Sequence, residues 1–440
     1  MSFSVEHPAA DSAGTGIVEY YLSVRQRTLS LCDTLAPEDT VVQSMADVSP
    51  TKWHLAHTTW FFERFVLKSH TQDYREFHPT FDHLFNSYYY SVGQMFTRAH
   101  RGLLSRPTLA QVLRYREYVD GQILALLQHG EPSASLRELI TLGVNHEQQH
   151  QELLLTDIKH VFSLNPLLPV FREAPVWNSA SATPLRFIEG PNGIIECGAN
   201  VADPGFSFDN ETPAHQVLVR PHKLASRPVT NSEYLEFVKD GAYEQCSLWL
   251  ADGWTVLNQE GWRRPFYWSE DLASEFTLNG QVALDPHAPV CHLSLYEADA
   301  FARWAGKRLP TEFELELALR QAACDGNLAD EDQFHPRAPR LNAPIAVGTS
   351  APSASEPSTG LAQLYGDVWE WTASPYSPYP GFVPLAGSLG EYNGKFMSSQ
   401  MVLRGGSCAT PRSHLRATYR NFFYPDARWQ FSGVRLAHDA

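Results

Sequence analysis

Two histidines four residues apart, His146 and His150, stand in the stretch NHEQQHQELLL at residues 145–155. The apolar residues that follow have helical spacing, and residues i and i+4 of a helix lie on one face, about one turn apart. Both imidazoles would then point the same way, as two ligands of one metal ion do. A solvated polar stripe on a helix is the competing interpretation, because such pairs arise by chance in a chain with 18 histidines.

A third histidine, His57, belongs to another segment with helical spacing, SPTKWHLAHTTWFFERF. It stands among Trp53 and Trp60 on the face that we expect to point inward, and facing helices of a bundle can build a metal site from inward side chains. Three neutral imidazoles suit iron(II), zinc or copper and leave coordination positions for substrates. The alternatives are a core histidine bonded to a backbone carbonyl, and a ligand role for His54, which we place off the inward face.

The elements that must position these histidines are four segments with helical apolar spacing, at residues 17–35, 53–65, 109–127 and 136–154. Four such segments predict a helical bundle. The connection between the second and third is about 40 residues long, far above the usual length of a bundle loop. Such a loop is either functional or disordered, and its aromatic content favours a functional segment.

The second half of the chain has a different character. Prolines and small polar residues at 163–184 predict a linker, and beyond it short β-type runs such as HQVLVRPHKLA and MVLRGGS alternate with glycine- and proline-rich stretches. Only TNSEYLEFV and SLYEADAFARWAG stand out as helices, and GTSAPSASEPSTG reads as a polar loop. We therefore expect a bundle at 1–162, a linker at 163–184 and a mixed domain at 185–440.

Charge and cysteine content exclude several classes of function. Lysine and arginine number 34 against 49 acidic residues, and a net charge of −15 argues against nucleic acid or an anionic membrane as the partner. No leader-like start and no membrane-spanning run is found in the sequence, so we expect a cytoplasmic protein. The six cysteines lack CxxC pairs or regular spacing, which favours reduced thiols over disulfides or a cysteine zinc site. Oligomeric state is not predicted.

Eight motifs spread over nearly the whole chain carry a resemblance to a known family. They are SPTKWHLAH, NHEQQHQE, FDNETPAHQVLV, PVTNSEYLEFV, GKRLPTEFELE, YGDVWEWTAS, VLRGGSC and SGVRLA. Together they resemble the ergothioneine-biosynthesis sulfoxide synthases, non-haem iron enzymes that join a thiol to the imidazole of hercynine (Nα-trimethylhistidine) with dioxygen. The motifs from FDNETPAH onward are shared with formylglycine-generating enzymes, but those use a pair of nearby cysteines, whereas Cys408 stands alone.

The resemblance implies an α+β protein: a DinB-like four-helix bundle followed by a mixed domain like C-type lectins and formylglycine-generating enzymes. It implies Fe(II) held by His57, His146 and His150. The substrates are hercynine, a thiol and O₂. Hercynine contacts are implied for Gln149, Asn421 and Phe422, and Arg98 and Arg101 match in spacing the arginines that bind the thiol donor's carboxylate.

The resemblance also bears on the donor and the proton source. Relatives that use γ-glutamylcysteine carry an aspartate where this chain has Phe423, so we favour cysteine as the donor. Their catalytic tyrosine near GEYNG aligns close to Leu389, with Tyr392 nearby, whereas NSYYYSVG resembles the branch whose tyrosines come from the first domain. We therefore predict Tyr88 and Tyr89 as proton donors, since a phenol stays protonated at neutral pH.

Four alternatives remain from the sequence. The thiol donor could be γ-glutamylcysteine, or the enzyme could act on unmethylated histidine as in ovothiol biosynthesis. A zinc-dependent thiol transferase is a third reading, because similar bundles hold zinc through three histidines. The last is a non-enzymatic, metal-stabilised bundle fused to a binding module, which leaves the tyrosine- and arginine-bearing loop without a task.

Overall fold

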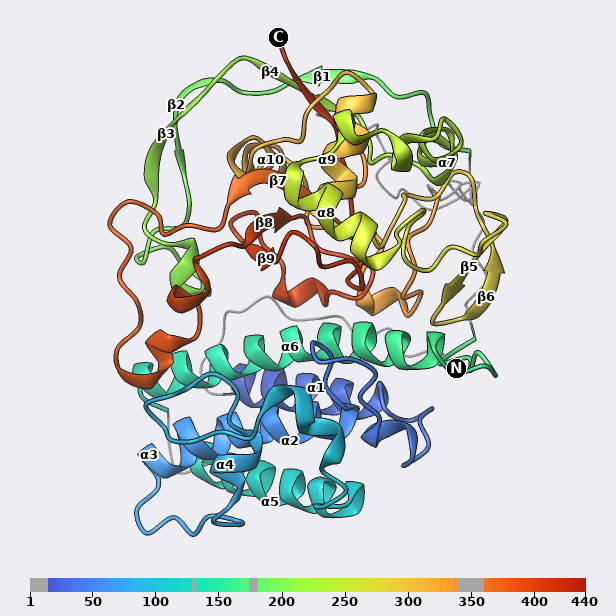
Figure 1. Cartoon of the computed structure of the whole chain (residues 1–440). Coiled ribbons are helices and arrows are strands. Elements are labelled where there is room, and N and C mark those ends of the chain that lie inside the picture. The colour runs from blue at the N-terminus through green and yellow to red at the C-terminus, as the bar shows by residue number, and fades with distance from the viewer. Residues whose placement is uncertain (1–14, 129–131, 174–180, 339–359) are drawn as a thin grey trace, which may run out of the picture. The chain divides into compact units, whose positions relative to one another are not determined.

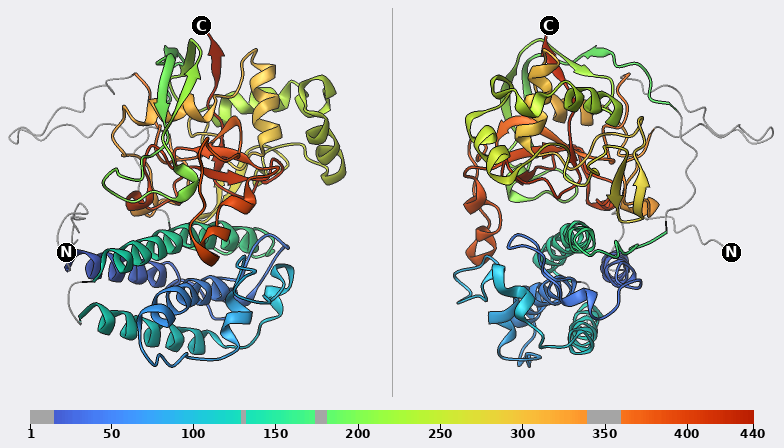
Figure 2. Two further views of the ribbon diagram at one scale, coloured as in Figure 1. Left: turned by 90° about the vertical axis from the view of Figure 1, so that its left-hand side faces the viewer. Right: turned by 45° about the vertical axis from the view of Figure 1, so that its right-hand side comes forward.

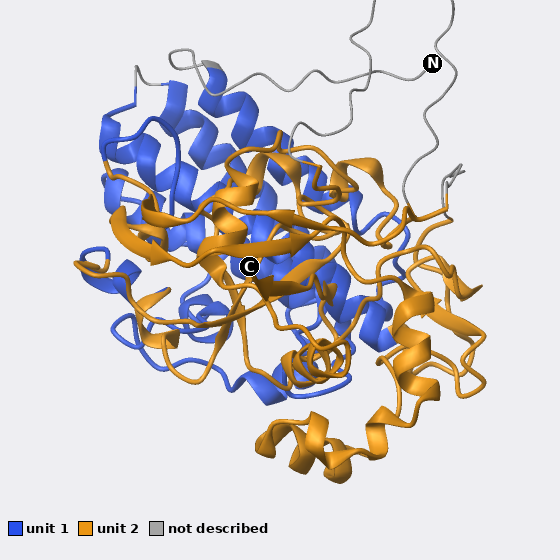
Figure 3. Ribbon diagram, turned by 90° about the horizontal axis from the view of Figure 1, so that it is seen from above, with its two compact units in different colours: residues 1–161, 202–208, 385–392 blue, residues 162–201, 209–384, 393–440 orange. Residues whose placement is uncertain are grey.

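The structure is a computed structural model that describes residues 15–128, 132–173, 181–338 and 360–440. The centre of the predicted linker, 174–180, and the predicted polar loop up to residue 359 lie outside the described residues. The chain forms two compact units (Figures 1 and 3). Unit 1 comprises residues 1–161, 202–208 and 385–392, and unit 2 comprises 162–201, 209–384 and 393–440.

Unit 1 contains the predicted helical bundle. Its helices are α1 (Thr15–Ser30), α2 (Thr51–Phe61), α5 (Leu109–Gln128) and α6 (Ala134–Ser163), and the right-hand view of Figure 2 looks nearly along several of them. Every residue of α2 is buried, so this helix forms the centre of the bundle. It continues directly into a π-helical stretch, Phe62–Leu67, and then α3 (Lys68–His70). The long connection holds α4 (Phe81–Phe85) and a 3₁₀ segment, Arg98–Leu103.

A buried ion-pair network joins three of the bundle helices. Glu147 of α6 is fully buried and accepts hydrogen bonds from Arg25 (2.9 Å) and Thr28 (2.6 Å) of α1 and from Arg116 of α5. Burial alone would raise the pKa of Glu147, but the guanidinium groups of Arg116 and Arg25 lower it to about 2. Removing one partner of such a buried network costs about 3–5 kcal/mol, so Glu147 fixes how α6 sits against α1 and α5.

Unit 2 is a mixed domain of short strands in small sheets. Strand orders are β1-β4-β11, β10-β7-β8-β9, β2-β3 and β5-β6. The strands are β1 (Phe187–Glu189), β2 (Gly193–Cys197), β3 (His215–Val219), β4 (His222–Ala225), β5 (Ser274–Thr277), β6 (Gly280–Ala283), β7 (Trp369–Pro375), β8 (Met401–Arg404), β9 (Asn421–Phe423), β10 (Ser432–Gly433) and β11 (Ala437–Asp439). The runs predicted as strands correspond to β3, β4 and β8, and the α+β class is confirmed.

Unit 2 has more helices than the two that stand out in the sequence. The predicted ones are α7 (Asn231–Lys239) and α9 (Leu295–Trp304), and each begins with a capping box. The structure adds α8 (Ala251–Glu260) and α10 (Glu312–Leu319). All residues of helix α10 except Phe313 are buried, and its Glu312 and Glu316 pair with Arg404 of β8 inside the domain, at 3.0 and 2.9 Å. It therefore lacks the one-sided pattern that marks a surface helix.

Candidate metal centre and substrate residues

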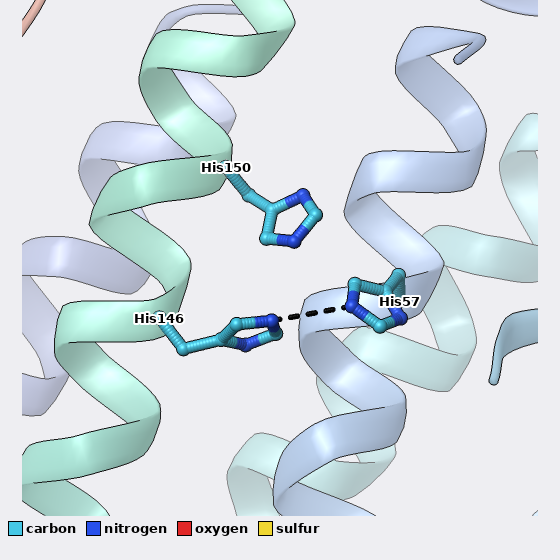
Figure 4. Close-up of side chains that lie close together, drawn as sticks. All are labelled: His57, His146 and His150. Atoms are coloured by element: carbon cyan, nitrogen blue, oxygen red, sulfur yellow. Dashed lines mark hydrogen bonds between the residues drawn. The ribbon is translucent and has the colours of Figure 1, made fainter. Parts of the chain in front are cut away.

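Three buried histidines from two helices of unit 1 converge on one point. His57 comes from α2 and His146 and His150 from α6, and one ring nitrogen of each lies within 4.8 Å of those of the other two. Figure 4 shows the three rings together, with His57 Nε2 and His146 Nε2 3.2 Å apart. The structure thus brings together the three histidines that the sequence predicts as metal ligands.

The geometry of these rings fits a metal ion. Two nitrogens that bind one ion at about 2.1 Å on neighbouring corners lie about 3 Å apart, as His57 Nε2 and His146 Nε2 do. His57 Nδ1 lies 2.6 Å from the carbonyl oxygen of Phe85. Because a carbonyl only accepts, Nδ1 carries the hydrogen and the lone pair is on Nε2, the nitrogen that faces His146.

Burial keeps the three imidazoles neutral, as metal ligands must be. Burial, followed by the effect of His146, lowers the pKa of His57 well below its usual value. Burial lowers the pKa of His146 to about 3, and burial followed by the effect of His146 lowers that of His150. All three rings therefore keep a lone pair for a cation at neutral pH.

The prediction that His54 lies off the inward face is wrong. Its side chain is buried, and its Nδ1 lies 2.9 Å from His150 Nδ1. Residues three apart share a helix face, so His54 and His57 lie near each other on α2. Since α2 is surrounded on all sides, it has no outward face for His54 to occupy.

Trp53 links the histidine cluster to a buried arginine. The Trp53 ring stacks on His57 with 4.5 Å between centroids, and the guanidinium carbon of Arg101 lies 3.4 Å from the Trp53 centroid. Arg101 donates to the hydroxyls of Ser49 (2.9 Å) and Ser87 (3.0 Å). Among the described residues no carboxylate forms an ion pair with Arg101, and burial lowers its pKa to about 9. A buried cation without an anionic partner is well suited to bind an anion.

The other predicted residues of the long loop lie beside these groups. Arg98 donates to the Tyr88 hydroxyl at 3.2 Å and to the carbonyl of Asp47. Burial raises the pKa of Tyr88, but the guanidiniums of Arg98 and Arg101 outweigh burial and lower it. Tyr89 is buried, with its ring 5.7 Å from Trp60, which in turn stacks on His57.

Tyr392 lies close to Leu389, the position at which the resemblance puts the catalytic tyrosine of the relatives that use γ-glutamylcysteine. It belongs to the segment 385–392 of unit 1, its hydroxyl donates to Oε1 of Gln149, and its ring meets that of His146 edge-on at 5.5 Å. The sequence offers a signal for Tyr392, because this tyrosine lies within the GEYNG motif, three residues after Leu389.

The predicted hercynine residues of unit 2 form strand β9. Phe422 stacks face to face on Tyr376, with 4.0 Å between centroids, and Asn421 Oδ1 accepts from the backbone N–H of Phe422. Tyr376 also lines a cavity of about 520 Å³ in unit 2, together with Asp252 and Asp426. An aromatic wall with carboxylates near it suits an organic cation.

Comparison with known proteins defines the class from the two domains. The model of the DinB superfamily matches residues 20–154, and that of the sulfatase-modifying factor enzyme 1-like domain matches residues 179–440. The chain is therefore a DinB-type bundle joined to a domain of the formylglycine-generating-enzyme type, as the fold and the histidine cluster indicate. The formylglycine-generating enzyme of Streptomyces coelicolor is 31% identical over 57% of this chain and 88% of its own length.

Relatives that match along the whole chain define the family. The hercynine oxygenase of Mycolicibacterium thermoresistibile is 33% identical over 95% of this chain and 93% of its own. That of Mycobacterium tuberculosis is 32% identical over 94% and 96%. The chain belongs to the hercynine oxygenase family, the sulfoxide synthases of ergothioneine biosynthesis, and is an oxidoreductase. This confirms the resemblance. None of the described helices is both long and apolar enough to cross a bilayer.

Proposed function

We propose that this enzyme joins cysteine to C2 of the hercynine imidazole in an Fe(II)- and O₂-dependent reaction that gives hercynyl-cysteine sulfoxide. One oxygen atom of O₂ becomes the sulfoxide oxygen. The other leaves as water with the hydrogens lost from C2 and from the thiol, so O₂ accepts four electrons. The observation that carries the proposal is the convergence of His57, His146 and His150 in a chain of this family.

Iron(II) is the proposed resident metal. When bound, it supplies O₂ activation, while the protein binds and orients the substrates and delivers protons. Three neutral imidazoles suit iron and leave coordination positions for substrates, and zinc suits the same ligand set. The O₂-dependent family favours iron over zinc.

Arg101 and Arg98 are proposed to bind the carboxylate of the thiol donor. A guanidinium forms paired hydrogen bonds to a carboxylate, and Arg101 is buried without an acidic partner among the described residues. Through Trp53 this cation is one ring away from His57. Cysteine is favoured over γ-glutamylcysteine because Phe423 offers no carboxylate to pair with the free amino group of the γ-glutamyl part.

Hercynine is proposed to contact Gln149, Asn421, Phe422 and Phe423, as the family resemblance implies for these positions. Its trimethylammonium cannot donate a hydrogen bond, so it is recognised by aromatic faces and by oxygen atoms of partial or full negative charge. The Tyr376–Phe422 stack offers such a face, and the Gln149 amide offers an oxygen that already accepts from Tyr392.

Tyr88 and Tyr89 are proposed to deliver the proton, and Tyr392 to orient Gln149. The lowered pKa of Tyr88 makes its phenol a better donor than an ordinary tyrosine, because a proton donor improves as its pKa approaches the working pH. The Tyr392 hydroxyl is already engaged with Gln149, which fits a role in holding the amide.

A single-turnover experiment tests the proposed function. The apoprotein is loaded with Fe(II) without oxygen, mixed with hercynine and cysteine, exposed to air and analysed by mass spectrometry. The expected product carries the mass of hercynine plus cysteine plus one oxygen, minus two hydrogens. Parallel reactions replace cysteine with γ-glutamylcysteine, hercynine with histidine, and Fe(II) with Zn(II). Coupling that is faster with either replacement substrate, or that proceeds with zinc, contradicts the proposal.

A further inference from the structure

His54 bridges an acidic residue and one of the clustered histidines. Its Nε2 lies 3.0 Å from Asp157 Oδ2, and its Nδ1 lies 2.9 Å from His150 Nδ1. His54 is 3% exposed and Asp157 4% exposed, so water does not compete for these hydrogen bonds. The three side chains form a hydrogen-bond chain, Asp157–His54–His150, which ends at a proposed metal ligand.

The direction of each hydrogen bond in this chain follows from which groups can donate and which can only accept. The Asp157 carboxylate only accepts, so His54 Nε2 carries a hydrogen. In the neutral ring His54 Nδ1 then has a lone pair, so His150 Nδ1 must donate to it. His150 is left with its own lone pair on Nε2, at the opposite side of its ring.

Asp157 is itself held in place by the backbone. It lies two turns beyond His150 on the same face of α6, and its Oδ2 also accepts from the backbone N–H of Ser49 at 2.7 Å. The hydroxyl of Ser49 in turn accepts from Arg101. Because a backbone amide fixes the carboxylate, the carboxylate can fix His54, and His54 can fix His150.

We propose that His54 and Asp157 are positioning residues that hold His150 in the tautomer and ring orientation that present Nε2 to the metal. The inference rests on the proposed function through one point, the assignment of the three histidines as ligands. Partners that accept from the outer nitrogen of a metal-bound histidine are typically worth about 10- to 100-fold in metal affinity. In this protein the carboxylate acts through an intervening imidazole rather than directly.

The test measures binding of Co(II) to the apoprotein under argon by its visible absorption, which needs no turnover. His54→Phe keeps a ring of similar size but cannot accept from His150, and His54→Leu is a second apolar variant with more room. Both are expected to weaken Co(II) binding at least tenfold and to alter the absorption band. His54→Gln is expected to recover most of the affinity, because its amide can accept from His150 and donate to Asp157.

Two further variants separate the possible outcomes. Gln151→Leu removes another buried polar group of α6, one that donates to Val24 and Thr28 of α1, and should leave Co(II) affinity unchanged. His146→Ala tests the metal site itself and should abolish tight binding. If His146→Ala loses the metal while His54→Phe and His54→Leu keep wild-type affinity and spectrum, the inference is overturned and the metal site stands. If His146→Ala binds as the wild type does, the ligand assignment fails as well.

Discussion

The guanidinium of Arg101 lies over the ring of Trp53, 3.4 Å from its centroid, while the same indole stacks on His57. A buried cation is thus held one ring away from a proposed metal ligand. Replacing Arg101 by Met is expected to raise the KM for cysteine at least tenfold with a smaller change in kcat, because hydrogen bonds to charged groups contribute about 1.5–3 kcal/mol. Steady-state kinetics with varied cysteine measures this change. Arg64→Met, which removes a partly exposed arginine paired with Asp82, is the control.

Tyr88 and Tyr89 are expected to determine whether the thiol is coupled to hercynine or only oxidised. Phenylalanine at both positions removes the proposed proton donors, so turnover should shift from C–S coupling to oxidation of cysteine alone. Product ratios measured by mass spectrometry report the shift. Tyr90→Phe, at an exposed position next in the chain, should behave as the wild type. An unchanged sulfoxide yield from the double variant rejects the assignment.

Tyr392→Phe is expected to weaken hercynine binding. The variant removes the hydroxyl that donates to Gln149 and leaves the ring beside His146. Loss of one hydrogen bond of about 1 kcal/mol corresponds to a rise of about fivefold in the KM for hercynine. Tyr74→Phe, which removes a hydroxyl bonded to Glu63 elsewhere in unit 1, controls for general effects. An equal rise in both variants, or a loss confined to kcat, contradicts the role of Tyr392.

Glu391 is expected to hold the tyrosine loop. Its carboxylate accepts from the backbone N–H groups of Tyr90 (2.9 Å) and Ser91 (3.0 Å). Glu391→Ala should accelerate hydrogen exchange of the amides at 88–93 and increase cysteine oxidation at the expense of coupling, as expected for the tyrosine double variant. Ser388→Ala, which removes a neighbouring partner of the Ser91 hydroxyl, should have a smaller effect. Unchanged exchange in Glu391→Ala would mean that the loop is held by other contacts.

Glu147 predicts a pH dependence of stability. Its pKa falls from 4.5 to about 2 in the folded protein, so the carboxylate contributes stability above pH 4.5 that is lost as the pH falls toward 2. Glu147→Gln should lower the free energy of unfolding by about 3 kcal/mol at pH 7, with a deficit that shrinks below pH 4.5. Urea unfolding followed by helical circular dichroism measures it. Glu138→Gln, at an exposed position of the same helix, should cost little at any pH.

The sequence predicts the elements whose signals are local and misses features that depend on distant partners. Helical spacing predicts the four bundle helices, and spacing together with the family resemblance predicts the two histidine motifs that meet in the cluster. His54 was misplaced because spacing identifies one buried face of α2, whereas the whole helix is buried. Helix α10 is not predicted because its acidic residues, which suggest an exposed surface, are buried in the domain and paired with Arg404. Gln149 and Tyr392 are 243 residues apart, a pairing that no local pattern encodes.

Residues 385–392 belong to unit 1 although they are synthesised long after the bundle helices, so unit 1 is complete only late in translation. A fragment that ends after α6 contains all three clustered histidines yet lacks Glu391 and Tyr392. On the ribosome, Glu391 can bind the backbone of the tyrosine loop only when most of the polypeptide has emerged. A bundle made of helices α1 to α6 alone would therefore contain the three clustered histidines without the groups that hold the tyrosine loop and the Gln149 amide.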